Sequence, residues 1–283
     1  LRPLLGIPGA AALALISSLQ STDGGAALTR RLRDEGALTD REAYVFAAFQ
    51  MASNAPIGNF LTSGTVLYLL KDQAGHPAVP VSLGFALALA LGFKVVSAQL
   101  MRLALLGMKE QGAGALRPVE NPADGQAGGQ ERGSPLPVVF AQGAVRGWQI
   151  VVRSLLPNVL MAFVIIKALT ATGLLAMIGQ ACGPAMAVFG LPGEAAAVLL
   201  SAWVSAGGGV GAAVSLYDAG LLTGEHIALL GPAIFLMGTQ LQHVGRCLGV
   251  IGVKGRMIPV TMAMPVLVAI ASMLVMKAVL AAG

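Results

Sequence analysis

Two stretches of the chain decide its fold: residues 6–39 read GIPGAAALALISSLQSTDGGAALTRRLRDEGALT, and residues 190–223 read GLPGEAAAVLLSAWVSAGGGVGAAVSLYDAGLLT. Aligned without gaps, they are identical at about 15 of 34 positions. Many identities fall on Gly, Pro, Ser and Asp, which a shared apolar composition does not explain. The sequence therefore predicts two copies of one structural unit.

The composition is that of a membrane protein. Of 283 residues, 56% are hydrophobic and 11% are charged, against roughly 25% charged in a soluble domain. Apolar stretches of about 20 residues cross a bilayer as helices. The sequence predicts an all-α, polytopic membrane protein with five spans, at 43–70, 81–106, 154–180, 226–250 and 257–281. The net charge of +5 indicates cytoplasmic Lys and Arg rather than nucleic-acid binding.

The two repeated stretches do not fit simple spans, because each is interrupted in the middle. The interruptions are Ser21–Gly25 and Ser205–Gly209. Each half-run has about 12 residues, or about 18 Å of helix, which is too short to cross alone. We expect a re-entrant helical hairpin or a helix unwound at its middle. Such backbone is tolerated at membrane depth where protein or a water-filled cavity surrounds it.

Charge indicates that the two units have opposite orientations. Residues 30–41 hold four Arg, whereas the matching 214–225 hold no Lys or Arg. The next loop reverses the bias, since 71–80 has one Lys and 251–256 has Lys254 and Arg256. Because basic loops stay in the cytoplasm, we predict inverted-topology repeats.

The predicted domains are a first repeat at 1–106, a flexible cytoplasmic linker at 107–138 and a second repeat at 139–283. The linker is rich in Gly and Pro and has no apolar period. The second repeat has a span, 154–180, before its interrupted stretch. We therefore expect the first repeat to lack its first span, which would precede Leu1.

Four motifs indicate a family: Gly143–Trp148, Phe163–Leu169, Gly190–Ala196 and Ser215–Gly224. Together they resemble the nucleoside-recognition, or Gate, domain family of bacterial inner-membrane proteins. The resemblance is closest to its YjiG/YjiH branch and looser to spore maturation proteins A and B. It implies membrane transport in the bacterial inner membrane and a homodimer. The chain lacks the Asn-Glu-Phe run of the nucleoside transporters, so the solute stays open.

The interruptions are the first candidate site, because a broken helix exposes backbone groups that hold ions or charged solutes. The alternative is close helix packing at small residues. Asp23 is ionisable, and three roles stay open: it binds a coupling proton or Na⁺, pairs with a buried Lys, or caps a helix. The candidate residues here are Ser21, Thr22, Asp23, Gly24, Ser205, Gly207 and Gly208.

Polar faces follow the interruptions in both units. Gln50 and Asn54 share one helix face, which continues past a kink expected at Pro56, and Gln240 and His243 share another. We predict that all four contact a solute near the membrane midplane. The alternative is hydrogen bonding between helices. Cys247 lies beside His243 without a carboxylate, so we predict no metal and no cofactor.

Two lysines fall near the centres of predicted spans, Lys94 and Lys167. A central Lys is costly unless it is paired or wetted. Both are candidates for charge coupling, and the alternative is a structural pair with a carbonyl or an Asp.

The sequence thus predicts a transporter that moves a small polar or charged solute, nucleoside-like or an ion, by alternating access. Its partners would be the lipid bilayer, the solute and a coupling ion, H⁺ or Na⁺. The alternatives are a membrane assembly component of the spore-maturation type and a passive channel. Enzyme signatures such as a Gly-x-Ser-Gly nucleophile or a phosphate loop are absent from the sequence, so we predict no enzyme.

Overall fold

The computed structural model describes residues 1–107, 145, 156–253 and 255–282, and for part of 156–166 it describes the backbone alone. Apart from Gly107, the predicted linker therefore lies outside the described residues. Regular structure in the described part is helical, with one isolated bridge between Lys71 and Pro77. The all-α prediction is confirmed for these residues.

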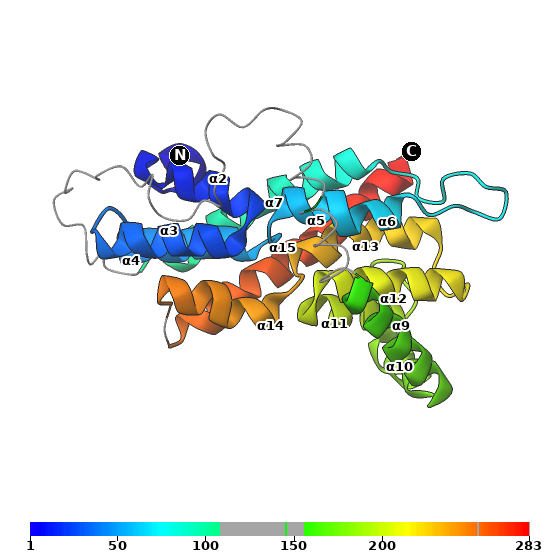
Figure 1. Ribbon diagram of the computed structural model, residues 1–283. Helices are drawn as coiled ribbons and strands as arrows, with labels where there is room; N and C mark the ends of the chain where they lie inside the picture. The colour runs from blue at the N-terminus through cyan, green and yellow to red at the C-terminus, as the bar shows by residue number, and fades with distance from the viewer. Residues whose placement is uncertain (108–144, 146–155, 254, 283) are drawn as a thin grey trace.

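The helices follow one another along the chain with the labels of Figure 1. They are α1 (Arg2–Leu5), η1 (Gly9–Ala11), α2 (Ala12–Gln20), α3 (Thr22–Asp34), α4 (Asp40–Met51), α5 (Pro56–Asn59), η2 (Phe60–Gly64), α6 (Thr65–Tyr68), α7 (Leu83–Ala104), α9 (Leu156–Ala171), α10 (Leu174–Ala187), α11 (Ala195–Val204), α12 (Ala206–Asp218), α13 (Gly224–Leu236), α14 (Gln240–His243), η5 (Val244–Gly249) and α15 (Met257–Ala282).

Three helical stretches of the described residues are long and apolar enough to cross a membrane: Leu83–Ala104, Gly224–Gly249 and Met257–Ala282. They match three of the five predicted spans. The stretch Gly224–Gly249 is not straight, since α13 ends at Leu236 and α14 begins at Gln240. This set of long apolar helices makes the chain a polytopic membrane protein.

The other two predicted spans are divided. The span 43–70 is interrupted at 52–55, directly before Pro56, where Ser53 and Ala55 have φ of 53° and 39°. The span 154–180 is interrupted after α9, where Gly173 has a φ of 73° and precedes α10. Left-handed backbone ends a helix, and hydropathy does not detect it.

Each repeated stretch forms two helices that pack against each other, α2 with α3 and α11 with α12. A single extended serine separates them: φ and ψ are −147° and 114° at Ser21, and −157° and 129° at Ser205. Each serine hydroxyl then accepts a hydrogen bond from the amide three residues on, at 3.2 Å from Gly24 and 3.4 Å from Gly208. Each break is thus also a helix N-cap.

The glycines after each break are helical, so of the two predicted alternatives the helices form a hairpin and not one helix unwound at the glycines. Because they lack a side chain, these glycines let the two helices of each hairpin pack closely. A Cβ atom on Gly25 would lie 2.6 Å from Ser18 Cβ, and one on Gly209 would lie 2.6 Å from Ala202 Cβ. Small residues let the two helices of each hairpin approach closely, which was the alternative interpretation.

Several elements recur in the two units at the same spacing along the chain. Helix α3 and helix α12 begin and end 184 positions apart (22 and 206, 34 and 218), as do α5 and α14 (56 and 240, 59 and 243). A π-helix follows in both units, η2 and η5. Helices α4 and α13 each pack against both α7 and α15, which also contact each other.

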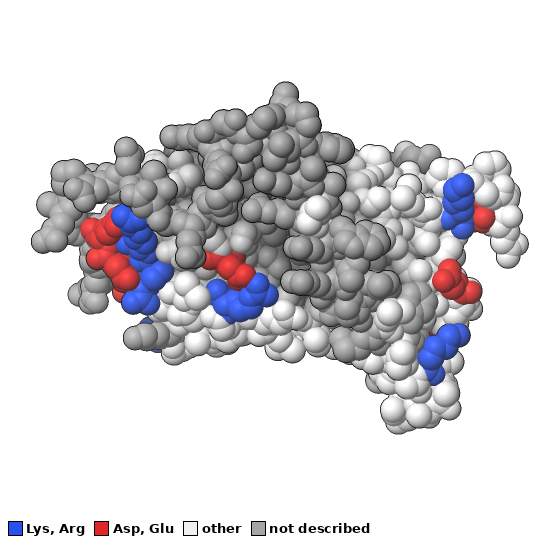
Figure 2. Space-filling view, viewed as in Figure 1, with Lys and Arg blue, Asp and Glu red and all other residues white. Residues whose placement is uncertain are grey.

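Figure 1 shows an elongated molecule in which the α3–α4 connection lies at the left end and the α12–α13 connection at the right end. The loop 71–80 also extends to the right. Figure 2 shows charged side chains toward the two ends and one further group of charges between them, while the rest of the described surface in this view is largely uncharged. This distribution suits a molecule whose middle lies in lipid.

Candidate functional site

Each unit has one broken helix, 40–68 (α4 to α6) in the first and Gly224–Gly249 (α13 to η5) in the second, and the breaks at 52–55 and 237–239 contact each other. The amide of Ser53 donates a hydrogen bond to the carbonyl of Leu236 at 3.0 Å. In return, Gln240 Nε2 donates to the carbonyl of Met51 at 3.2 Å. The last carbonyl of α13 thus accepts a hydrogen bond from the first break, and the last carbonyl of α4 accepts one from the residue that follows the second break. This mutual contact places candidate residues from both units in one polar cluster.

The first hairpin joins the cluster through the residues after its break. Thr22 Oγ1 donates to Asn54 Oδ1, and Asp23 forms an ion pair with Arg246 of η5. Thr22 is buried, whereas Asp23 and Arg246 are exposed. Asp23 is therefore partnered in this structure, and it links the first hairpin to the second unit.

Gln50 connects three helices at the buried base of the cluster. Its Nε2 donates to Thr29 Oγ1 of α3 at 2.9 Å, and its Oε1 accepts from Cys247 Sγ of η5 at 3.8 Å. Thr29 and Cys247 are both buried. Gln50 thus has the interhelical role that was the alternative to solute contact.

Lys94 of α7 is fully buried. Its Nζ donates to the carbonyls of Ala52 at 2.6 Å and Ser53 at 3.0 Å, and it lies 4.6 Å from the ring centroid of Phe49. A cation at a helix C-terminus is favourable, and cation–π contact adds about 0.5–2 kcal/mol. Both offset part of the desolvation cost, which is several kcal/mol for a buried ion. Pairing with carbonyls was the structural alternative for this residue.

Two polar atoms in the cluster are buried without a hydrogen-bond partner among the described residues, Ser53 Oγ and Gln240 Oε1. Beside them His243 is buried, and its Nδ1 lies 2.7 Å from the carbonyl of Thr239. Because a carbonyl only accepts, Nδ1 carries the proton in this contact. Buried polar atoms are normally satisfied by protein, water or ligand. These two are therefore the atoms most in need of a further partner.

The second hairpin break is closed by the protein itself. Thr239 Oγ1 accepts a hydrogen bond from the amide of Ala206 at 3.1 Å, and the amide of Thr239 donates to the carbonyl of Ala202 at 2.8 Å. The serine Ser205 caps α12, and Gly207 and Gly208 lie in its first turn. The corresponding position in the first unit, Ala55, has no hydroxyl for this role. The hairpin break at Ser21 is therefore more open than the hairpin break at Ser205.

Thr239 was not among the residues predicted from the sequence. The available signal was its position, directly before Gln240 and 184 residues after Ala55, at the end of the apolar run 227–237. Of the predicted residues, Lys167 is not brought to the cluster, since it is exposed on α9. Ser21 and Gly24 lie at its edge, where Ser21 caps α3.

A cavity of about 400 Å³ lies away from this cluster, between α6 and the start of α7. Its lining is Thr65, Tyr68, Leu69, Pro77, Val79, Pro80, Val81, Ser82 and Leu83. None of the predicted site residues lines it. The cavity lies at the end of the molecule where the 71–80 loop is found.

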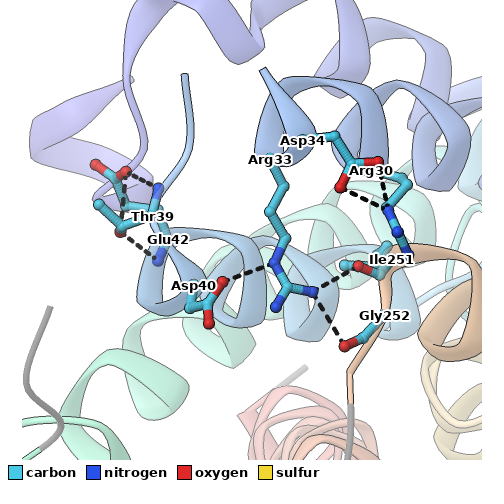
Figure 3. A network of polar contacts seen from close by, with 8 residues as sticks. All are labelled: Arg30, Arg33, Asp34, Thr39, Asp40, Glu42, Ile251 and Gly252. Atoms are coloured by element: carbon cyan, nitrogen blue, oxygen red, sulfur yellow. Dashed lines mark hydrogen bonds and ion pairs between the residues drawn. The ribbon is translucent and has the colours of Figure 1, made fainter. Parts of the chain in front are cut away.

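A second polar network lies at the opposite end and connects the two units (Figure 3). Arg33 Nε donates to Asp40 Oδ1 at 2.7 Å, and Arg33 Nη1 donates to the carbonyls of Ile251 at 2.8 Å and Gly252 at 3.0 Å. Burial would lower the pKa of Arg33, but its hydrogen bond to Asp40 and the nearby acidic groups outweigh burial and raise the pKa above its usual value. Arg33 therefore stays charged.

The fold and the cluster define a class: a multi-pass α-helical membrane protein in which two broken helices meet at a buried polar centre. The family model described as Gate, nucleoside recognition, matches residues 152–282. The chain is 52% identical over 139 residues to inner membrane protein YjiG of Escherichia coli K12, covering 49% of this chain and 91% of that protein. It is 41% identical over 102 residues to uncharacterized protein YjiH of the same strain, covering 36% and 41% respectively.

This chain belongs to the Gate, nucleoside-recognition, family and is a multi-pass protein of the inner membrane. The predicted family and location are confirmed. No solved structure matches it.

Proposed function

We propose that the chain is a transporter that binds a small polar solute where its two broken helices meet. The observation that carries this proposal is the mutual contact of the breaks, Ser53 N with Leu236 O and Gln240 Nε2 with Met51 O. In secondary transporters, discontinuous helices from two repeats build the substrate site near the midplane. The family's description, nucleoside recognition, supports a polar solute of this kind.

The solute would contact Ser53 Oγ and Gln240 Oε1, the two oxygen atoms of the cluster that have no hydrogen-bond partner in the described part of the chain. Gln240 Oε1 needs a donor, and Ser53 Oγ either donates or accepts. Hydroxyl and N–H groups meet both needs, as a nucleoside does with its sugar and base. Asn54 and His243 border these atoms, and the remaining candidates Thr22 and Gln50 hold the surrounding helices.

The repeats would have inverted topology, with both hairpins re-entrant from opposite leaflets. Supporting this, the matched α3–α4 and α12–α13 connections lie at opposite ends of the molecule (Figure 1). Arg30, Arg31 and Arg33 lie at one end, which the basic-loop rule assigns to the cytoplasm. Access would alternate as one unit moves against the other. The coupling ion, H⁺ or Na⁺, and the homodimer stay predictions.

Flux measurements on the purified full chain in proteoliposomes test the proposal. A panel of radiolabelled nucleosides and other small polar solutes would be offered with and without imposed pH or Na⁺ gradients. We expect saturable uptake of at least one solute. Gln240→Leu should lower that uptake by about tenfold, because the solute loses a buried hydrogen bond.

The matched control is Thr62→Val, whose hydroxyl donates to the carbonyl of Gly58 within its own turn, and uptake should be unchanged. Uptake that survives Gln240→Leu would place the solute elsewhere. Flux that never saturates would indicate a channel. No flux for any solute in the panel would favour the assembly role.

A further inference from the structure

The ends of the molecule carry two contacts that correspond to each other through the repeat. Arg33 lies near the end of α3 and donates to the carbonyls of Ile251 and Gly252, which follow the broken helix of the second unit. Tyr217 lies 184 positions later, near the end of α12. Its hydroxyl donates to the carbonyl of Lys71 at 3.0 Å, and Lys71 follows the broken helix of the first unit. Each hairpin therefore holds the end of the other unit's broken helix.

The two contacts differ in strength. Arg33 makes two hydrogen bonds from a charged group to carbonyls, and Asp40 fixes its guanidinium in place. Tyr217 makes one neutral hydrogen bond, and that contact is exposed. Hydrogen bonds from a charged group are roughly twice as strong as neutral ones. The Arg33 end is therefore held more firmly than the Tyr217 end.

The backbone at the Arg33 end is shaped for this contact. Gly252 has a φ of 85°, and a Cβ atom there would lie 2.9 Å from Arg33 Nη1 and 3.0 Å from Arg30 Nη1. Any larger residue would displace the guanidinium groups. Figure 3 shows Arg33 reaching from α3 to this glycine, with Asp40 on its other side. The contact is thus built from both units and is not an incidental surface pair.

We propose that these contacts are the two gates of the transport path, with Arg33 as the stronger, cytoplasmic latch and Tyr217 as the weaker, outer latch. The proposal rests on the transporter function above and adds how access is controlled. A broken helix moves when its held end is released, and release at one end opens the central cluster to that side. Because the outer latch is weaker, the resting protein opens outward more readily than inward.

Cys247 is a native reporter of opening, since it is a free and buried thiol in the central cluster. The measurement is the rate at which a membrane-impermeant methanethiosulfonate reagent modifies Cys247, in a Cys182→Ser background. Spheroplasts expose the outer face, and inverted vesicles expose the cytoplasmic face. No solute is needed, so a failure of this test is distinct from a failure of the flux test.

We expect Arg33→Gln to speed modification from the cytoplasmic face alone, by about tenfold or more, because two charge-assisted hydrogen bonds are lost. Tyr217→Phe should speed modification from the outer face alone, by about threefold. In the background with both latches intact, the outer rate should exceed the cytoplasmic rate. The matched control is Arg31→Gln, which removes an exposed pair with Glu35 and should change neither rate.

If Arg33→Gln does not fold, Arg33→Lys keeps the charge but loses the forked geometry, and should also speed cytoplasmic modification. Unchanged rates in the folded Arg33 variant would overturn the proposal. Equal acceleration from both faces would overturn it as well, because it would show general loosening. Acceleration from the face opposite to the one expected would overturn the assignment of either latch.

Discussion

At the scale of the residue, the glycines of the hairpins serve packing rather than flexibility. Gly209 lies in the first turn of α12, and a Cβ atom there would lie 2.6 Å from Ala202 Cβ and 2.9 Å from Ala202 Cα. Because the second neighbour is backbone, α11 and α12 would have to separate. We expect Gly209→Ala to lower the free energy of unfolding by about 1–3 kcal/mol, measured by thermal unfolding in detergent.

The control for that measurement is Gly92→Ala in α7. A Cβ atom on Gly92 meets no atom of the described residues within 4 Å, and alanine favours a helix over glycine by about 1 kcal/mol. This variant should be as stable as the parent chain or more stable. Equal losses in both variants would contradict the packing role of Gly209.

A second residue-scale prediction concerns Thr29, which accepts the hydrogen bond of Gln50 Nε2. Thr29→Val preserves the shape but leaves a buried amide donor without its partner. An unsatisfied buried group costs about 1–3 kcal/mol, so the midpoint of thermal unfolding should fall. Thr65→Val is the comparison, since its hydroxyl donates to the carbonyl of Leu61 one turn earlier, in the adjoining η2, and holds no other helix. A fall of the same size there would show that the loss is not specific to Gln50.

At the scale of the element, the sequence was informative wherever small and polar residues mark a change of direction. The hairpin breaks at Ser21 and Ser205 were predictable, because Ser and Gly interrupt apolar runs too short to cross. Pro56 likewise marked the kink before α5. The breaks at 173 and 237–239 were not foreseen, because each lies inside a stretch that is apolar and long enough on average to be predicted as one span. Left-handed backbone at Gly173 and Thr239 depends on packing that a hydropathy profile does not contain.

The candidate site was only partly predictable, because the sequence shows the spacing of residues along one helix but not the contacts between helices. Spacing along a helix correctly placed Gln240 and His243 on one face, but it could not show that Gln240 reaches Met51 of the other unit. Lys167 looked equivalent to Lys94 by its central position. The structure separates them: Lys94 meets the free carbonyls of a broken helix, whereas Lys167 is exposed on α9. Only the arrangement of the helices distinguishes the two.

The closure of the second hairpin break gives an element-scale prediction. Thr239→Val removes the acceptor for the amide of Ala206 while it keeps the branched shape. The first turn of α12 then loses a capping interaction worth about 1 kcal/mol. Hydrogen–deuterium exchange over residues 205–208 should become faster, while exchange over 21–24 should stay the same. Unchanged exchange at 205–208 would show that Thr239 does not close this break.

At the scale of the whole molecule, the repeat was visible in the sequence, but the way its copies meet was not. Identities between 6–39 and 190–223 establish two related units without fixing their contact. The structure adds that α4 and α13 each pack against both α7 and α15. Each unit therefore buries part of the other, and neither is expected to be stable alone. The unequal distribution of Lys and Arg between matched loops predicts that the two units have opposite orientations in the membrane. Cysteine labelling tests this prediction directly.

Inverted repeats require that matched loops face opposite sides of the membrane. In a background with Cys182→Ser and Cys247→Ala, single cysteines would be introduced by Ala37→Cys in the α3–α4 loop and Ala219→Cys in the α12–α13 loop. A membrane-impermeant maleimide applied to spheroplasts should label the second and not the first, because the Arg-rich end stays in the cytoplasm. Gln73→Cys, in the loop 71–80, should label like Ala219→Cys. Labelling of Ala37→Cys and Ala219→Cys from the same side would mean that the repeats are parallel, and a shared midplane site entered from two leaflets would then be impossible.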